Sequence, residues 1–187
     1  PSGEPSSYRS NPLRLAEFTL SRREPAYVGR AKAVAEIEAE RLGGDAPEKL
    51  TAILDKVGDG SALVKTTQFG SCVFANKPGD GSAREQAASC QKVLGGFANI
   101  CYEFATKRYR SNCINWGILP FTLDAGTSFD YAPGDCVFVP GIEDIPARVI
   151  RTDGAVEGLM LHVKGLTDDE KEIILDGCLM NYYAKRN

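Results

Sequence analysis

The chain has 187 residues, of which 43% are hydrophobic and 25% charged, and its formal net charge is −3. This length suffices for one domain, or slightly more, with a buried core. The acidic balance argues against a general attraction to nucleic acid or to an anionic membrane surface. No apolar run approaches the ~20 residues needed to span a bilayer. We therefore expect a globular protein with no membrane partner.

The N-terminal part, over residues 12–57, is predicted to be mainly helical. Asn11-Pro12 has the cap-then-proline pattern of a helix start and leads into residues 13–21. Apolar residues then recur at helical spacing between Val28 and Leu42, and Gly43-Gly44 ends that helix. Another helix follows Pro47. These last two helices are expected to cover the core with their apolar stripes.

The remainder, residues 61–187, alternates between strand and helix patterns. Strands are predicted at 62–66, 72–75, 97–102, 118–123, 136–139, 148–151 and 159–163, and helices from 82 to about 94, at 105–112 and at 168–183. The strands after residue 135 are expected to form a mainly antiparallel unit. An α/β fold with a mixed central sheet follows from this order.

The segment Gly79-Asp80-Gly81-Ser82-Ala83-Arg84-Glu85-Gln86-Ala87-Ala88 carries the clearest chemical signal. A glycine loop delivers Ser82 and Arg84 to the first turn of a helix, where unsatisfied N–H groups and the helix dipole stabilise an anion. This combination indicates a carboxylate or phosphate site. The structural alternative is that Ser82 and Glu85 form a capping box, and the loop alone favours that alternative.

The pentapeptide Gly-Asp-Gly-Ser-Ala occurs twice, at 58–62 and at 79–83. The first copy runs into strand-like residues with no acid at the capping position, so an ordinary turn is predicted there. Only the second copy is expected to open a helix. Neither copy matches the glycine-rich loops that bind nucleotides.

Four segments in order resemble the small C-terminal "swivel" domain of the aconitase and isopropylmalate dehydratase superfamily. They are the segment 79–88, whose first residues we call the Ser82 loop (Gly79–Arg84), the run Asn115-Trp116-Gly117-Ile118-Leu119-Pro120-Phe121, the run Tyr8-Arg9-Ser10-Asn11-Pro12, and residues 166–175. The resemblance implies a three-layer β/β/α swivel domain over residues 1–187, with the N-terminal helical segment as an addition. Because the chain begins at Pro1 inside one of these motifs, we expect it to be a piece of a longer protein.

The resemblance implies a hydro-lyase that reversibly dehydrates a di- or tricarboxylic hydroxy-acid. Ser82 matches the family's serine base, Arg84 and Arg9 match carboxylate-binding arginines, and Gly81 and Ala83 line the same loop. Ala83 replaces the second serine of the family's motif and Gln86 replaces its usual histidine, which leaves the exact substrate open. A non-catalytic relative that keeps the fold for anion binding or regulation is the alternative.

The family's [4Fe–4S] cluster is expected outside this chain, on cluster-bearing aconitase domains of the same protein. The cysteines form no C-x-x-C pair and are expected to be buried residues of a reduced compartment, the cytoplasm; they are Cys72, Cys90, Cys101, Cys113, Cys136 and Cys178. His162 lies in an alternating apolar run and is predicted to be a strand residue. We therefore assign no metal ligand here.

The basic run Lys107-Arg108-Tyr109-Arg110 allows two interpretations. An interleaved aromatic residue is compatible with RNA binding, but a single basic helix in an acidic domain favours a solvated face or a contact with the cluster-bearing domains.

Overall fold

The strands form two sheets, one parallel and one antiparallel. The computed structural model describes Tyr8, residues 10–143 and residues 145–186. The strands are β1 (Ser71–Ala75), β2 (Gly96–Cys101), β3 (Leu119–Thr122), β4 (Cys136–Phe138), β5 (Ile145–Ile150) and β6 (Val156–Leu161). The helices are α1 (Pro12–Ser21), α2 (Pro25–Leu42), α3 (Glu48–Leu54), α4 (Gly60–Leu63), α5 (Arg84–Val93), α6 (Lys107–Asn115), α7 (Asp168–Leu175) and α8 (Leu179–Ala184).

Sheet order follows chain order in both sheets, β1-β2-β3 parallel and β4-β5-β6 antiparallel. An antiparallel bridge links them, because Thr122 at the end of β3 and His162 just after β6 exchange two backbone hydrogen bonds of 2.9 Å. The predicted α/β class with parallel and antiparallel strands is thus confirmed.

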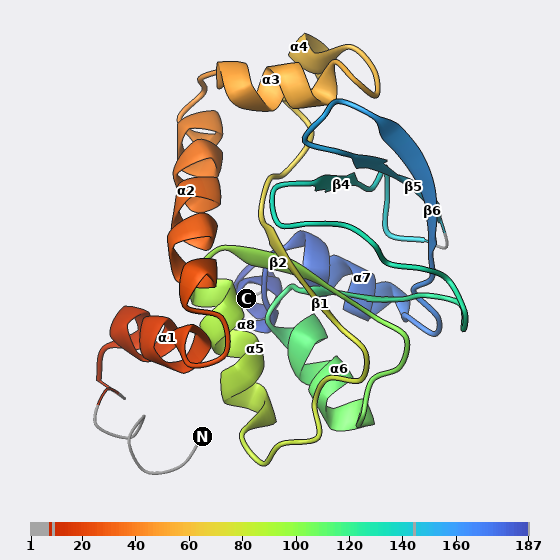
Figure 1. Ribbon diagram of the computed structural model, residues 1–187. Helices are drawn as coiled ribbons and strands as arrows, with labels where there is room; N and C mark the ends of the chain where they lie inside the picture. The colour runs from red at the N-terminus through yellow and green to blue at the C-terminus, as the bar shows by residue number, and fades with distance from the viewer. Residues whose placement is uncertain (1–7, 9, 144, 187) are drawn as a thin grey trace.

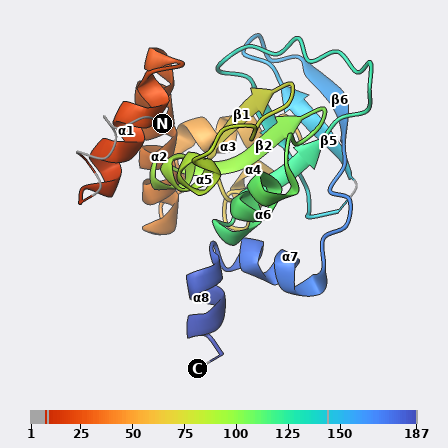
Figure 2. The same cartoon turned by 90° about the horizontal axis from the view of Figure 1, so that it is seen from below.

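Side-chain alternation along β2 shows how the layers are stacked. Ile100 faces the antiparallel sheet and joins a core with Phe121, Val149 and Leu161. Its neighbour Asn99 faces the opposite way and bonds to Gln91 of α5 and Tyr109 of α6. These two helices lie beside the parallel sheet in Figures 1 and 2. Both faces of the parallel sheet are therefore covered, and the layers are antiparallel sheet, parallel sheet and helices, as the β/β/α expectation stated.

The N-terminal helices pack outside this core at two places. Ala16 of α1 and Ala31 of α2 share a cluster with Cys90 and Leu94, at the C-terminal end of α5. Figure 1 shows α1 and α2 beside α5. The short helices α3 and α4 share another cluster, which Phe138 of β4 joins. The predicted helices are confirmed, although Leu42 is 71% exposed and does not face the core.

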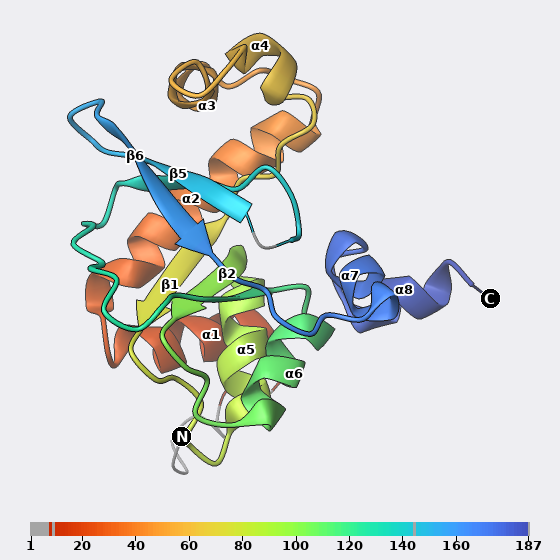
Figure 3. The same cartoon turned by 90° about the vertical axis from the view of Figure 1, so that its right-hand side faces the viewer.

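Two predicted elements are wrong. Residues 62–66 are not a strand, because Asp59 accepts a hydrogen bond from the Ala62 N–H at 3.1 Å and starts α4. The first pentapeptide copy therefore opens a helix too. The single helix over 168–183 is two helices, α7 and α8, because Gly177 turns the chain with φ +88° (Figure 3).

Over the described ranges, every helix is too short or too polar to cross a membrane.

Candidate functional site

The Ser82 loop lies at the carboxyl edge of the parallel sheet. It leaves β1 and enters α5, beside the connection that leaves β2 and enters α6. The Ala105 N–H donates to the Pro78 carbonyl at 2.8 Å, and Thr106 Oγ1 donates to the Gly79 carbonyl at 3.0 Å. Two loops are thus fixed against each other at the edge where open α/β sheets place their ligands.

Gly79 must be glycine for two reasons. Its φ is +97°, and a Cβ there would lie 2.4 Å from the Cβ of Tyr109. The Tyr109 hydroxyl donates to Asn99 Oδ1 at 2.8 Å and accepts from Gln91 Nε2 at 2.9 Å, and Asn99 Nδ2 donates to Gln91 Oε1 at 2.7 Å. Burial raises the pKa of Tyr109, so its hydroxyl stays a neutral donor. This closed network joins β2, α5 and α6, and Tyr109 also packs against Gly79 of the Ser82 loop.

Ser82 does not cap α5. The helix begins at Arg84 with Ala83 as N-cap residue (φ −97°, ψ 55°), and no side chain makes a cap hydrogen bond. Glu85 instead accepts a hydrogen bond from Trp116 Nε1 at 2.9 Å. The capping-box interpretation is therefore wrong. Ser82 is exposed, and within the described part of the chain no hydrogen bond engages its hydroxyl.

Gly81 directly precedes Ser82, and Arg84 follows it two residues later. The Nε atom of Arg84 is buried and has no hydrogen-bond partner among the residues that the structure describes. A buried donor without a partner is costly and requires an explanation. Gly81 is exposed, and a Cβ on it would meet no atom within 4 Å.

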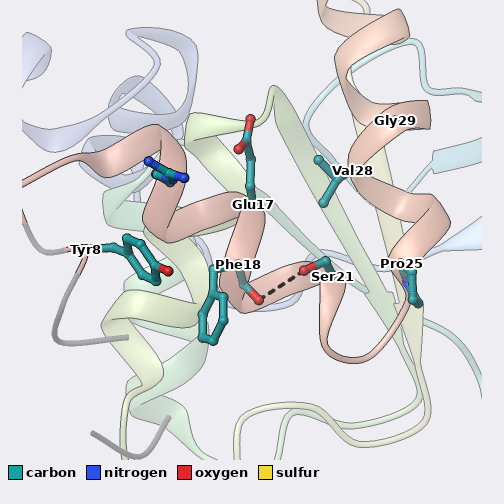
Figure 4. Close-up of a pocket in the computed structure, with 8 residues that line it drawn as sticks. Tyr8, Glu17, Phe18, Ser21, Pro25, Val28 and Gly29 are labelled. Carbon is teal, nitrogen blue, oxygen red and sulfur yellow. Dashed lines mark hydrogen bonds between the residues drawn. The ribbon is translucent and has the colours of Figure 1, made fainter. Parts of the chain in front are cut away.

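Arg9 lies outside the described residues. Its neighbour Tyr8 packs on Phe18 with ring centroids 5.3 Å apart, and the Arg14 guanidinium lies over the Tyr8 ring at 5.8 Å. A hollow of about 450 Å³ opens beside these residues, between α1 and α2 (Figure 4). Its lining includes none of the residues Gly81–Arg84. The Ser82 loop is therefore not part of this pocket, and its residues Gly81 and Ser82 are exposed.

The described residues do not fit an iron–sulfur cluster. Nowhere in the described ranges do three His, Cys, Asp or Glu side chains gather closely enough to hold a metal ion. Cys101 and Cys113 are fully buried, and burial raises the pKa of Cys101 to about 11 and of Cys113 to about 12. Cluster ligands are thiolates, which these environments disfavour. His162 lies beside Asp124, with Nε2 3.1 Å from the carboxylate.

The run Asn115–Phe121 has a structural role. Gly117 has φ +65°, and a Cβ there would lie 2.1 Å from the Gly177 carbonyl oxygen. Ile118 and Phe121 are buried in separate clusters. This run therefore locks α6 and β3 onto the α7–α8 turn.

The basic run does not form one continuous face. Lys107 and Arg108 are exposed, whereas Tyr109 is only 3% exposed and cannot stack on a base. Arg110 Nη2 donates to the Lys164 carbonyl at 2.7 Å. These contacts favour a solvated face over an RNA site.

Sequence reasoning did not assign a role to Trp116 or to the network of Gln91, Asn99 and Tyr109. Asn99 carried a detectable signal, because a polar residue in the middle of an apolar strand requires a buried partner. Trp116 carried none, since its partner lies 31 positions away.

Sequence comparisons agree with this arrangement. The family described as "Aconitase C-terminal domain" matches residues 44–126, a range that contains the Ser82 loop. Aconitate hydratase A of Bradyrhizobium diazoefficiens is 29% identical over 139 residues, which cover 68% of this chain and 15% of that enzyme. The corresponding enzyme of Rickettsia conorii is 26% identical over 155 residues, which cover 76% of this chain and 17% of that protein.

A small-subunit relative is matched over most of its own length. The 3-isopropylmalate dehydratase small subunit of Metallosphaera sedula is 35% identical over 122 residues, which cover 65% of this chain and 70% of the subunit. Among solved structures, 3-isopropylmalate dehydratase of Methanocaldococcus jannaschii matches with a TM-score of 0.44 and 29% identity, over 67% of this chain and 70% of that chain. By sequence, the chain belongs to the aconitase and isopropylmalate dehydratase family.

Proposed function

We propose that this chain is the substrate-closing domain of an aconitase-like hydro-lyase that acts on a di- or tricarboxylic hydroxy-acid. Ser82 would be the base, and Arg84 and Arg9 would bind substrate carboxylates. One observation carries the proposal: the exposed Ser82 hydroxyl is free of the helix that its sequence predicts it to cap, and it stands beside Arg84, whose Nε lacks a partner within the described residues.

The chemistry needs a base that removes a proton from the carbon next to a carboxylate. A serine hydroxyl is a very weak acid, but the start of α5 and the Arg84 guanidinium both favour its charged form. Arginine suits the carboxylate because its fork donates two parallel hydrogen bonds. The small residues Gly81 and Ala83 on either side of Ser82 leave space for the substrate.

We propose that the metal cluster lies outside this chain, on cluster-bearing domains of the same protein. A [4Fe–4S] cluster, when bound by cluster-bearing domains, would supply the Lewis acid for the departing hydroxyl. The exposure of Ser82 supports this division, since a base for carbon acids works best in a site closed to water. We propose the cytoplasm as the location, where reduced cysteines persist.

Two serines provide a matched test, because Ser61 occupies the same place in the first pentapeptide copy as Ser82 in the second. In the enzyme assembled with its cluster-bearing part, Ser82→Ala should lower kcat by several orders of magnitude and change KM little. Ser61→Ala should leave both constants unchanged. Near-normal turnover of Ser82→Ala would rule out Ser82 as the base.

Ala83 favours one alternative function. Because the family's second serine is missing, a non-catalytic domain that binds a carboxylate or another anion for regulation is the second candidate. Binding of a hydroxy-acid that depends on Arg84, together with no turnover in the assembled protein, would identify this case.

A further inference from the structure

The first turn of α5 could begin in two ways that differ by one residue. The spacing of Ser82 and Glu85 is that of a capping box, in which Ser82 would be the N-cap and Glu85 would bind the Ser82 N–H. In the observed arrangement the helix begins at Arg84, and Glu85 is bound elsewhere. A real capping box exists in the same chain: Thr167 and Glu170 make both reciprocal hydrogen bonds, of 3.2 and 3.0 Å.

The start of α5 differs from the start of α7 because its glutamate contacts Trp116. Glu85, Ala88 and Lys92 share one face of α5, and the turn from α6 to β3 lies against that face. Lys92 Nζ approaches the Gly117 carbonyl oxygen at 3.5 Å, and Trp116 packs against the cluster of Ala88 and Cys113. Its indole N–H then donates to Glu85 Oε1 at 2.9 Å.

The turn that carries Trp116 is itself fixed. The Trp116 N–H closes α6 by donating to the Asn112 and Cys113 carbonyls, both at 3.1 Å. Gly117 then approaches Gly177 closely, and the next residue, Ile118, is fully buried. The indole is consequently held in place by the core and not by Glu85 alone.

We infer that Trp116 is a positioning residue for Ser82. It holds the Glu85 carboxylate away from the Ser82 N–H, so the capping box does not form and the Ser82 hydroxyl remains outside the helix. The box would itself include a hydrogen bond to the Glu85 carboxylate, from the Ser82 N–H, so bond strength alone does not separate the two arrangements. The indole is fixed by its packing on the core, and the Glu85 carboxylate bonds to it instead of to Ser82. The inference about turnover rests on the proposed role of Ser82; the inference about the helix start does not.

Melting temperatures test the helix start directly in the full 187-residue chain. We expect Ser82→Ala to leave the melting temperature unchanged in the wild type, where Ser82 caps nothing. In a Trp116→Phe background the box can form, so Ser82→Ala should lower the melting temperature by about 2–4 °C, the shift that a typical cap gives in a chain of this size. Thr167→Ala is the matched control and should lower it in both backgrounds.

An NMR pH titration tests the contact between the Trp116 indole and Glu85 without a substitution at Trp116. The indole N–H resonance is assigned directly, because Trp116 is the chain's only tryptophan. We expect its indole N–H resonance to move when the pH is lowered into the acid range, and not to move in Glu85→Ala. A resonance that ignores Glu85, or a Ser82→Ala effect that is the same in both backgrounds, would overturn the inference.

Turnover separates this inference from the proposed function. In the assembled enzyme, Trp116→Phe should lower kcat while KM changes little, and Trp116→Phe combined with Glu85→Ala should recover part of that loss, because no box can then form. If the melting and NMR results are as expected but turnover is unchanged in both Trp116→Phe and Ser82→Ala, the inference about the helix start holds. Ser82 is then refuted as the base.

Discussion

Arg84 combines a constraint of the fold with an unmet chemical need. It is the first residue of α5, so it is held at the positive end of the helix dipole. Its buried Nε has no partner among the described residues. Native proteins seldom leave such a donor unpaired without a reason, and the proposed carboxylate site gives one.

Replacing Arg84 by lysine keeps the charge and removes the fork. We expect Arg84→Lys to weaken hydroxy-acid binding about 10- to 100-fold, because one charge-assisted hydrogen bond is worth about 1.5–3 kcal/mol. Arg23→Lys is the control, since Arg23 is exposed on the turn after α1. Isothermal titration with a panel of hydroxy-acids measures the effect. Equal weakening at both positions would mean that general electrostatics, and not a shaped site, governs binding.

The sequence predicted that Ser82 and Arg84 share one loop but not how they bond, and the meeting of Arg9 with that loop stays a prediction. Ser82 and Arg84 do meet at one loop, because the order of strand, glycine loop and helix places them there. The cap was mispredicted because Glu85 has two possible partners, the Ser82 N–H and the Trp116 indole, and it bonds to the indole. A local motif cannot reveal a competitor such as Trp116.

The α6–β3 and α7–α8 turns depend on each other. Gly117 and Gly177 both have positive φ, and the Gly177 carbonyl oxygen lies where a Gly117 side chain would be. The same contact explains why residues 168–183 are two helices, since the chain must turn at Gly177 to pass Gly117.

A substitution at Gly117 should therefore disrupt two elements at once. We expect Gly117→Ala to lower the free energy of unfolding by about 2–4 kcal/mol, from the left-handed backbone and the backbone clash together. Gly29→Ala is the control: Gly29 is an exposed α2 residue with no atom within 4 Å of a built Cβ. It should stabilise the chain by up to about 1 kcal/mol. Urea unfolding measures both; equal effects would contradict the close approach.

Elements with strong periodicity were predicted well, and elements set by one contact were not. The parallel strands follow from apolar runs, and α5 follows from the glycine loop before it and Gly95-Gly96 after it. The strand at 62–66 was mispredicted because its β-branched residues suggested a strand, whereas Asp59 caps a helical turn and Val64 is buried beneath α3. A single cap and one buried side chain outweighed the local propensity.

In the molecule as a whole, the residues that stabilise the fold are buried, and the candidate functional residues lie at the surface. The core between the sheets, the α5–α6 cluster and the polar network hold the fold, and the Ser82 loop lies at the rim where it reaches solvent. The layering was expected from the family resemblance alone, because periodicity does not say which sheet face a helix covers. The openness of the loop supports its completion by a second surface.

Buried thiols should make the whole fold sensitive to alkaline pH. Cys101 and Cys113 are fully buried, one on β2 and one on α6, and their pKa values are raised to about 11 and about 12. Below about pH 8.5, the ordinary thiol pKa, both thiols are protonated whether the chain is folded or unfolded. Above it, the unfolded chain gives up protons that the folded chain retains, so the unfolded state binds fewer protons and stability falls as pH rises.

Burial raises the pKa of Tyr109 as well and adds to this fall, whereas the lowered pKa of Lys92 opposes it. We expect the urea midpoint to stay level from pH 7 to 8.5 and then to decrease steadily toward pH 11. The double variant Cys101→Ala/Cys113→Ala should begin less stable, because two small cavities replace the sulfur atoms, but its midpoint should decrease less steeply with pH. A double variant with the same alkaline slope as the wild type would show that these thiols do not titrate on unfolding and that the loss of stability has another source.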